Sequence, residues 1–327
     1  MKGVTALRFV VTLLALLASR EALADRQSHL LAIAACPPWL SFGDVAADRF
    51  ALQSCGHTID RITGAAIRHL GVTEERATRL LDQAATRAGV EAAFARLGKK
   101  MGAGDRLYVY LNLHGGPSAG NYKGYPIVDE TLAFWTDEVP ARPFTDHGFM
   151  FVKTLRDLIL AVPAGEIVII VDSCHSGLGF DDFRFVPSSL QAAGRRVATV
   201  FSARKTQVAH FTPDLREALF TRMLSGALEV SPTERLSRAV ALAAEATHDT
   251  VRALCAASGG PADLHGAGLD YVSFCTQDPF TFDPYGLLDD IPVASDSPAA
   301  TSGAGGAARP LRPGQIWDRG TGSPDPG

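Results

Sequence analysis

The chain has 327 residues, of which 46% are hydrophobic and 20% charged, and its formal net charge at pH 7 is −4. This length suits one large domain or two small ones, with enough apolar side chains for a substantial core. A slightly acidic chain without a basic stripe gives no electrostatic case for nucleic-acid binding. The charge is compatible with a basic binding partner but does not require one.

The first 24 residues have the pattern of a cleavable export signal. Lys2 and Arg8 are basic, residues 9–18 are nearly all apolar, and residues 22–24 (Ala-Leu-Ala) match the small-x-small cleavage pattern. The apolar stretch is short for a membrane span, which disfavours the alternative of an uncleaved anchor. We therefore expect a mature protein that begins at Asp25, is periplasmic or secreted, and has no membrane contact after cleavage.

The N-terminal half of the chain alternates predicted strands and helices. Apolar runs typical of strands occupy residues 29–35 and 107–113, with a short apolar run at residues 80–81 between them. Apolar side chains at helical spacing predict helices over residues 59–70 and around residues 90–97. A long loop is predicted over residues 115–146, and loops of this length are usually functional or mobile.

The C-terminal half continues the same alternation. A helix is predicted over residues 152–162, followed by strands at residues 167–171 and 197–201. N-cap residues followed by proline predict two further helices, at about residues 213–228 and 232–254. This order favours an α/β domain with a mostly parallel sheet covered by helices on both faces. Residues 290–327 are rich in Pro, Gly, Ala, Ser and Asp, and we expect a disordered tail after a domain that spans residues 25–289.

Two of the predicted strands end on reactive side chains. The first ends on His114-Gly115, and the other ends on the segment Asp172-Ser-Cys174-His-Ser-Gly177. Ligands of parallel sheets bind beyond the carboxyl ends of the strands, where both segments lie. A thiolate is a strong nucleophile, and a nearby imidazole can accept the proton of the thiol. The backbone N–H groups of Gly115 and Cys174 are candidate donors to an oxyanion.

These segments resemble the caspase-like cysteine peptidases of the C14 type in clan CD. The paired blocks Tyr108–Gly115 and Val171–Gly177 are most similar to the metacaspase and bacterial caspase-like branch, and residues 199–207, 218–221 and 224–228 resemble the segment that closes the family's domain. The similarity covers roughly residues 29–255. It implies a caspase–hemoglobinase-like three-layer sandwich and the hydrolysis of peptide bonds.

The resemblance also implies roles for particular residues. Cys174 would be the nucleophile and His114 the general acid/base, with the amides of Gly115 and Cys174 forming the oxyanion hole. The acid two positions before the cysteine, Asp172, would line a pocket for Arg or Lys, and Ser202 would border the substrate groove. The expected partner is a peptide or protein with basic residues. This chemistry requires no cofactor or metal, and the acidic cluster that binds calcium in some relatives has no match.

The chain departs from the family pattern near Cys55. Metacaspases usually carry Cys-x-Asn-Asp there, and the acid of that segment also faces the pocket. This chain has Cys55-Gly-His-Thr58 instead, and its nearest acid is Asp60. The pattern Gln-Ala-Cys-x-Gly of mammalian caspases is missing too, which argues against cleavage after Asp.

The cysteine count bears on which thiol stays reduced. An exported protein with five cysteines leaves at least one thiol free when the others pair. If Cys174 is the free one, the simplest scheme pairs Cys36 with Cys55 and Cys255 with Cys275. The sequence leaves all three connectivities of these four cysteines open.

Two rival functions remain open on the same fold. The chain could be a non-catalytic binding or scaffold module, since a fold does not determine a function. It could also be a transpeptidase or ligase, in which an amine intercepts the thioester instead of water. We assign His175 a structural role, because a residue next to the nucleophile in an extended segment points to the opposite side. The sequence says nothing about the oligomeric state.

Overall fold

The computed structural model of the chain describes most of the predicted domain. The described residues are 26–36, 45–117, 120–122, 125–127, 130–136, 149–184, 188–214, 216–257 and 275–295. The predicted export signal at residues 1–24 lies outside them, as do parts of the predicted long loop and residues 296–327.

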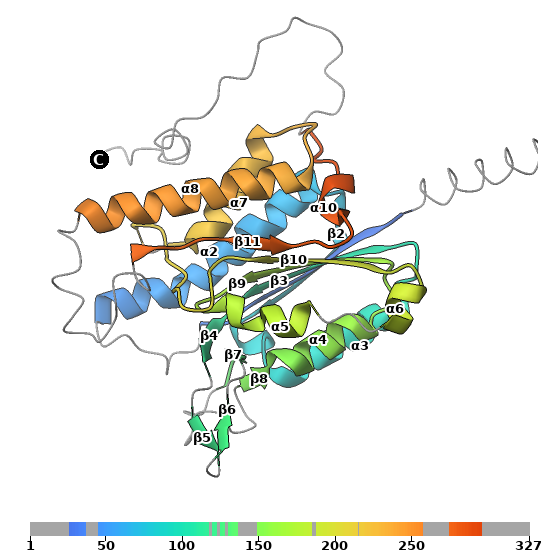
Figure 1. Cartoon of the computed structure of the whole chain (residues 1–327), viewed down its shortest axis with the longest axis horizontal. Helices are drawn as coiled ribbons and strands as arrows, with labels where there is room; N and C mark the ends of the chain where they lie inside the picture. Colours follow the sequence, from blue (N-terminus) through green and yellow to red (C-terminus); the bar gives the residue numbers. More distant parts are fainter. Residues whose placement is uncertain are drawn as a thin grey trace, which may run out of the picture.

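A six-stranded sheet forms the centre of the molecule (Figure 1). The strand order is β11-β10-β9-β3-β1-β2, and every neighbouring pair is parallel except β10 with β11. The strands are β1 (Ser28–Ala34), β2 (Val72–Leu81), β3 (Arg106–Asn112), β9 (Glu166–Asp172), β10 (Arg196–Phe201) and β11 (Phe280–Phe282).

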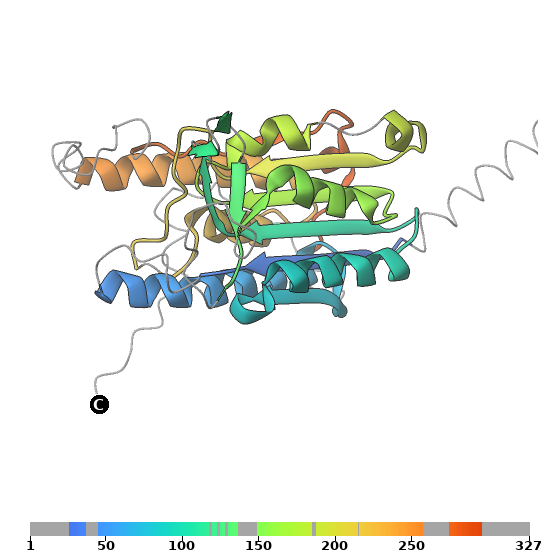
Figure 2. The same ribbon diagram turned by 90° about the horizontal axis from the view of Figure 1, so that it is seen from below.

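Helices cover both faces of this sheet. In Figures 1 and 2, one face carries α2 (Val45–His69), α7 (Leu219–Val230), α8 (Leu236–Ala257) and α10 (Leu287–Asp290). The other face carries α3 (Arg87–Lys100), α4 (Val152–Ala161), α5 (Phe180–Phe183) and α6 (Ser188–Ala192). The predicted α/β architecture, a three-layer sandwich around a mostly parallel sheet, is therefore confirmed.

Two apolar cores fill the space between the sheet and its two helical layers. Successive side chains of a strand point to opposite faces, so Leu30 and Ala32 of β1 enter the core beneath α2, α7 and α8, whereas Leu31 and Ile33 enter the core beneath α3 and α4. These strands are buried along their whole length, which explains their continuous apolar sequences. Burial of each such Leu or Ile side chain stabilises the fold by about 1.5–3 kcal/mol.

Several element boundaries differ from those expected. The second strand runs over ten residues as β2, because its polar residues lie on the exposed edge of the sheet. The two late helices begin at Leu219 and Leu236, later than the Pro signals predict. The hydroxyl of Thr212 instead donates to Asp214 Oδ1 (2.5 Å) and accepts from the Glu217 backbone N–H (3.2 Å), which closes a turn before α7.

The predicted long loop is not structureless where it is described. It contains the short strands β4 (His114–Pro117), β5 (Gly120–Tyr122), β6 (Tyr125–Ile127) and β7 (Glu130–Ala133), and β8 (Phe149–Phe151) follows it. Strand β7 pairs with both β4 and β8 in a small antiparallel sheet at the carboxyl end of β3. Two 3-10 turns, η1 (Asp82–Ala84) and η2 (Ser176–Gly179), complete the described elements.

The predicted start of the tail at residue 290 is too early. Ile291 and Val293 are buried, and the Val293 N–H donates to the Glu234 carbonyl (2.9 Å). The Ala294 N–H donates to the carbonyl of His69 at the end of α2 (2.9 Å). Burial of Ile291 and Val293 together with these backbone hydrogen bonds attaches residues 291–294 to the domain.

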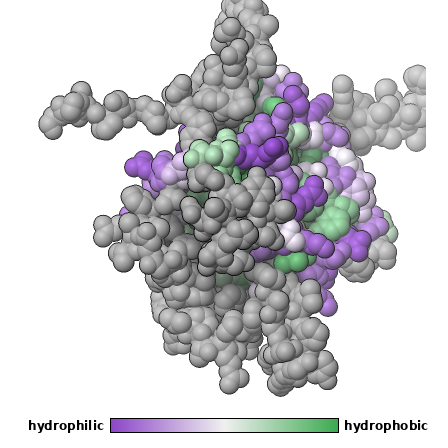
Figure 3. Space-filling model, turned by 60° about the vertical axis from the view of Figure 1, so that its left-hand side comes forward, coloured by the Kyte–Doolittle hydropathy of each residue, from purple (hydrophilic) through white to green (hydrophobic). Residues whose placement is uncertain are grey.

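The described surface is mixed in character. On the face shown in Figure 3, hydrophilic residues surround separate small apolar areas. The exposed large apolar side chains among the described residues are Phe151, Val230 and Leu254. Within the described part of the chain, no helix is long and apolar enough to cross a membrane.

Candidate active site

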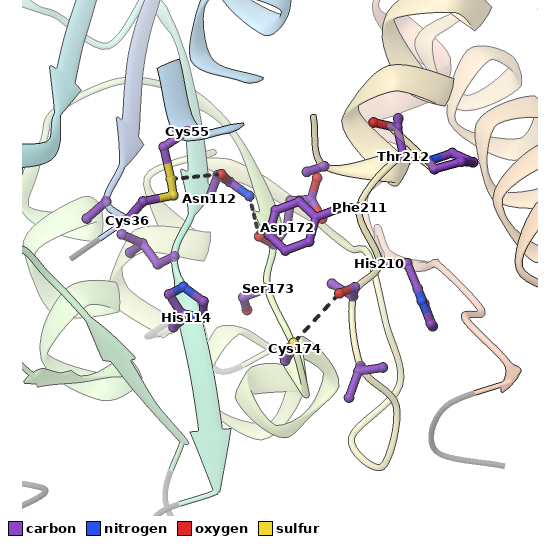
Figure 4. Close-up of a pocket in the computed structure, with 16 residues that line it drawn as sticks. Cys36, Cys55, Asn112, His114, Asp172, Ser173, Cys174, His210, Phe211 and Thr212 are labelled. Carbon is purple, nitrogen blue, oxygen red and sulfur yellow. Dashed lines mark hydrogen bonds between the residues drawn. A yellow bond between two sulfur atoms is a disulfide. The ribbon is translucent and has the colours of Figure 1, made fainter. Parts of the chain in front are cut away.

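The register of the sheet brings the two predicted reactive segments together. Strands β3 and β9 are parallel neighbours in which Asn112 pairs with Asp172. His114 and Cys174 each follow that pair by two residues, so both leave the same edge of the sheet (Figure 4). The Asn112 side-chain N–H donates to the Asp172 carbonyl (3.1 Å) and holds the two strand ends at this register.

A cavity of about 460 Å³ opens at this edge. It brings Cys174, His114 and Asp172 together, as the sequence predicts. The residues around it are mostly apolar, and they come from five parts of the chain: Ala35, Cys36, Cys55, Asn112, Leu113, His114, Asp172, Ser173, Cys174, Val208, Ala209, His210, Phe211, Thr212, Pro213 and Ala218.

Cys174 is the free thiol of this cavity. The structure pairs Cys36 with Cys55 and Cys255 with Cys275, which is the simplest scheme that the sequence allows, and leaves Cys174 unpaired. Its Sγ lies 3.8 Å from the Ala209 carbonyl oxygen, a weak hydrogen bond that requires the thiol proton. Burial raises the pKa of Cys174, so the thiol is protonated at neutral pH.

His114 is half-buried at the start of β4. Burial lowers the pKa of His114 to about 4. The imidazole is therefore neutral at pH 7 and can accept a proton. Both shifts favour a neutral thiol and a neutral imidazole in this cavity.

Asp172 is a deeply buried carboxyl at the wall of the cavity. Its side chain is 1% exposed, and Oδ2 accepts hydrogen bonds from the Thr221 backbone N–H (3.2 Å) and the Thr221 hydroxyl (2.6 Å). Its other oxygen, Oδ1, is buried and accepts no hydrogen bond of normal geometry, although the hydroxyls of Ser202 and Tyr110 lie close enough to the carboxyl to favour its charged form. Burial raises the pKa of Asp172, although the hydrogen bonds from Thr221 favour its charged form.

The family's second pocket acid has no counterpart among the described residues that line the cavity, where Asp172 is the only carboxylate. Thr58 is buried, and its hydroxyl accepts from the Ala218 N–H (3.0 Å). Asp60 pairs with Arg79 (3.1 Å) on the exposed surface. The Cys36–Cys55 disulfide takes up this side of the cavity instead.

Three other predicted positions differ in detail. Gly115 lies in β4 and pairs with Leu132, where the sequence predicts an open turn. Ser202 is fully buried and is not among the described residues that line the cavity, so we do not retain its predicted contact with substrate; its hydroxyl lies 3.5 Å from the Ser173 carbonyl. The backbone of His175 is left-handed (φ 56°) and not extended as predicted. Its ring nevertheless hydrogen-bonds to the Lys205 carbonyl (3.0 Å), and it is not among the described residues that line the cavity.

The sequence gives no sign of one whole wall of the cavity. Residues 208–213 form it, and they are brought there by the loop between β10 and α7. The only hint is the resemblance over residues 199–207, which stops just before this wall. Among the described residues, no group of three or more His, Cys, Asp or Glu side chains could hold a metal ion.

Comparisons with known proteins show the fold only. No family model and no curated protein matches the chain. Its structure is similar to protein GSU0716 from Geobacter sulfurreducens, with a TM-score of 0.51 and 18% identity over 82% of this chain and 99% of that one. Caspase-1 from Spodoptera frugiperda gives a TM-score of 0.46 and 12% identity over 79% of this chain and 86% of that one. Identities this low show nothing about the chemistry of the site.

Proposed function

We propose that this chain is an exported, caspase-like cysteine endopeptidase of the metacaspase type that cleaves after Arg or Lys. One observation carries the proposal. A single cavity brings together a free thiol, an imidazole whose lowered pKa keeps it neutral, and one buried carboxyl. The first two groups suit nucleophilic attack on a carbonyl, and the third suits a basic side chain next to the cleaved bond.

The neutral resting state sets the order of proton transfers. His114 accepts the thiol proton as Cys174 Sγ attacks the carbonyl carbon, and backbone N–H groups at Gly115 and Cys174 stabilise the oxyanion. When the C–N bond breaks, His114 donates that proton to the leaving amine and a thioester remains. Water then attacks the thioester with His114 as the base, the acid product leaves, and the thiol recovers its proton.

The shape and charge of the cavity support basic specificity. Its apolar walls suit the aliphatic stem of Lys or Arg, and the carboxyl of Asp172 at the wall attracts the charged end. An Asp side chain would meet a like charge there and would be rejected.

The cysteine pairing supports export. Two disulfides together with one free thiol suit an oxidising compartment, where disulfides form and persist. We therefore keep the periplasmic or secreted location as part of the proposal.

The first experiment compares the mature wild type with Cys174→Ala on fluorogenic peptides that end in Arg, Lys or Asp. We expect turnover of the Arg and Lys peptides by the wild type and none by the variant. Equal turnover in the two proteins, or inactivity of a wild type whose Cys174 reacts with iodoacetamide, would end the peptidase proposal in favour of a binding module. An added peptide amine, with products read by mass spectrometry, separates hydrolysis from transpeptidation.

A second experiment tests Asp172. Asp172→Asn keeps the side-chain volume and an acceptor for Thr221 but removes the charge. We expect kcat/KM for Arg and Lys peptides to fall by roughly 30-fold or more, since loss of one member of a buried charge pair costs about 2–5 kcal/mol. An unchanged thermal melting temperature controls for the integrity of the fold; the alkylation rate cannot serve, because the Asp172 charge itself raises the pKa of Cys174. A preference of the wild type for Asp peptides would refute this role of Asp172.

A further inference from the structure

The wall of the cavity at residues 208–213 has little regular structure of its own. Its only strand-type pairing is an isolated bridge between Phe211 and Ala218. The cavity loop (residues 203–213) therefore depends on contacts from elsewhere for its position. Several of those contacts come from a segment far along the chain, residues 275–278, which we call the strap.

The strap binds the cavity loop at two points. The first is Gln277, which is fully buried. Its side-chain oxygen accepts from the His210 backbone N–H (2.9 Å), and its amide N–H donates to the Ser202 carbonyl (3.0 Å). The Gln277 side chain thus connects Ser202, directly after β10, with His210 in the cavity wall.

The second point is Gln207, which is 3% exposed. Its amide nitrogen donates to Asp278 Oδ2 (2.6 Å) and to the Thr276 hydroxyl (2.8 Å). Its amide oxygen accepts from the backbone N–H groups of Arg204 (3.0 Å) and Asp278 (2.9 Å). A Gln side chain has two N–H donors and two lone pairs, so the hydrogen-bonding capacity of Gln207 is fully used.

Gln207 also touches the turn that carries the nucleophile. Its backbone carbonyl accepts from the N–H of His175 (2.8 Å), the residue directly after Cys174. His175 has a left-handed backbone (φ 56°), which a non-glycine residue adopts only when its surroundings hold it there. Two residues further on, the Ala209 carbonyl faces the Cys174 thiol.

The strap itself is fixed to helix α8. Cys275 is disulfide-bonded to Cys255 in the last turns of that helix. Asp278 Oδ1 pairs with Nδ1 of His248, two turns earlier in α8 (2.5 Å). The path from α8 through the strap and Gln207 to the nucleophile turn is therefore a continuous series of covalent and hydrogen bonds.

We propose that Gln207 is a positioning residue, held by the strap, that sets the place of the Cys174 turn and of the cavity wall for catalysis. This inference rests on the proposed peptidase function. Gln207 is not among the described residues that line the cavity, so it acts on the reaction only through Cys174 and the wall.

The test exchanges donor and acceptor in the hydrogen bond between the Gln207 amide nitrogen and Asp278 Oδ2 (2.6 Å). Gln207→Glu places two carboxylates against each other and should displace the turn. Asp278→Asn in the same chain restores an amide facing a carboxylate, with the Asn oxygen left for His248. We expect Gln207→Glu to lower kcat for an Arg peptide by about 10- to 100-fold with a smaller change in KM, since small displacements of reacting groups cost that much.

The double variant should recover kcat to within about threefold of the wild type, because the two changes couple directly. The alkylation rate of Cys174 by iodoacetamide should rise in Gln207→Glu, as the thiol loses its burial, and return in the double variant. Gln83→Glu, an exposed change of the same type outside the cavity lining, should alter neither measurement.

The outcomes separate the two proposals. If the wild type shows no peptidase activity, the proposed function fails, and the alkylation rates still decide whether Gln207 positions the thiol. If Gln207→Glu keeps both the wild-type kcat and the wild-type alkylation rate, the positioning role is wrong. The positioning role is also wrong if Gln207→Glu loses kcat and the double variant does not recover it, provided that thermal melting shows both variants to be folded. Should Gln207→Glu fail to fold, the same measurements on Asp278→Asn and the double variant decide the question.

Discussion

At the scale of single residues, the environment decides the protonation state of the proposed dyad. Cys174 and His114 leave the same sheet edge, and burial disfavours the charged form of both. A thiolate–imidazolium pair would need both charges in this mostly apolar cavity. The structure therefore favours a neutral dyad in which the proton moves during the attack.

This protonation state predicts the pH dependence of alkylation. The rate at which iodoacetamide modifies Cys174 should keep rising through pH 9, because only the thiolate reacts and its pKa is raised. His114→Ala should change that profile little and yet lower peptide hydrolysis by about 10²- to 10⁴-fold. A plateau in the alkylation rate that begins below pH 7 in the wild type would show a stable ion pair and contradict the neutral dyad.

At the scale of elements, close approach of two segments fixes the nucleophile turn. Gly177 in η2 faces the cavity loop, and a Cβ there would lie 2.6 Å from the Lys205 backbone nitrogen. Gly165, before β9, would meet the Ala103 carbonyl oxygen at 2.1 Å. Both positions require glycine for the same steric reason, but only Gly177 belongs to the turn that holds Cys174.

These two glycines form a matched pair of substitutions. Gly177→Ala and Gly165→Ala should each lower the free energy of unfolding, by about 1–3 kcal/mol, since the clashing atoms are backbone. Only Gly177→Ala should also lower kcat/KM at a temperature where both variants are folded.

The control for this pair is Gly98→Ala in α3, where an added Cβ meets nothing within 4 Å. It should raise the free energy of unfolding by about 0.5–1 kcal/mol, because alanine favours the helix. Equal activity of Gly177→Ala and Gly165→Ala would show that the turn tolerates displacement. Urea unfolding and peptide assays on the same preparations supply both measurements.

At the scale of the whole molecule, a buried histidine ties stability to pH. His29 on β1 is 1% exposed, and both of its ring nitrogens lack a hydrogen-bond partner. Burial lowers the pKa of His29, and nearby Lys100 and Arg76 lower it further, while Asp105 opposes them. The folded protein therefore holds this ring neutral in a range of pH where the unfolded chain protonates it.

This difference predicts loss of stability in mild acid. Below the ordinary histidine pKa of about 6.5, the unfolded chain binds a proton at His29 that the folded protein excludes. The free energy of unfolding therefore decreases as the pH is lowered. The slope from one such group is at most about 1.4 kcal/mol per pH unit. His29→Leu should flatten this acid limb and cost little at pH 8, since it removes two unsatisfied polar atoms. Urea unfolding of the two proteins between pH 5 and 8 tests this, and parallel pH profiles would contradict it.

The sequence alone was enough to predict the central strands β1, β3, β9 and β10, most helices and the candidate dyad, because these signals are local, but it missed β11 and the short strands β4 to β8. A continuous apolar run such as that of β9 indicates a buried strand wherever its neighbours lie, and reactive side chains at the ends of parallel strands share one edge. The predicted boundaries were wrong where side chains make contacts other than those assumed, as at Thr212, and where buried Ile291 and Val293 extend the domain past residue 290.

Only the tertiary structure decided what completes the site. The fold selected one of the possible disulfide pairings. It also placed the cavity wall at residues 208–213, and the strap that holds this wall comes from a distant part of the chain. Gln207 and Asp278 are 71 residues apart, and no local pattern marks either of them. Hydrogen bonds of this kind depend on where the fold brings the backbone. The sequence therefore determined the reactive groups, and the packing of distant segments determined their surroundings.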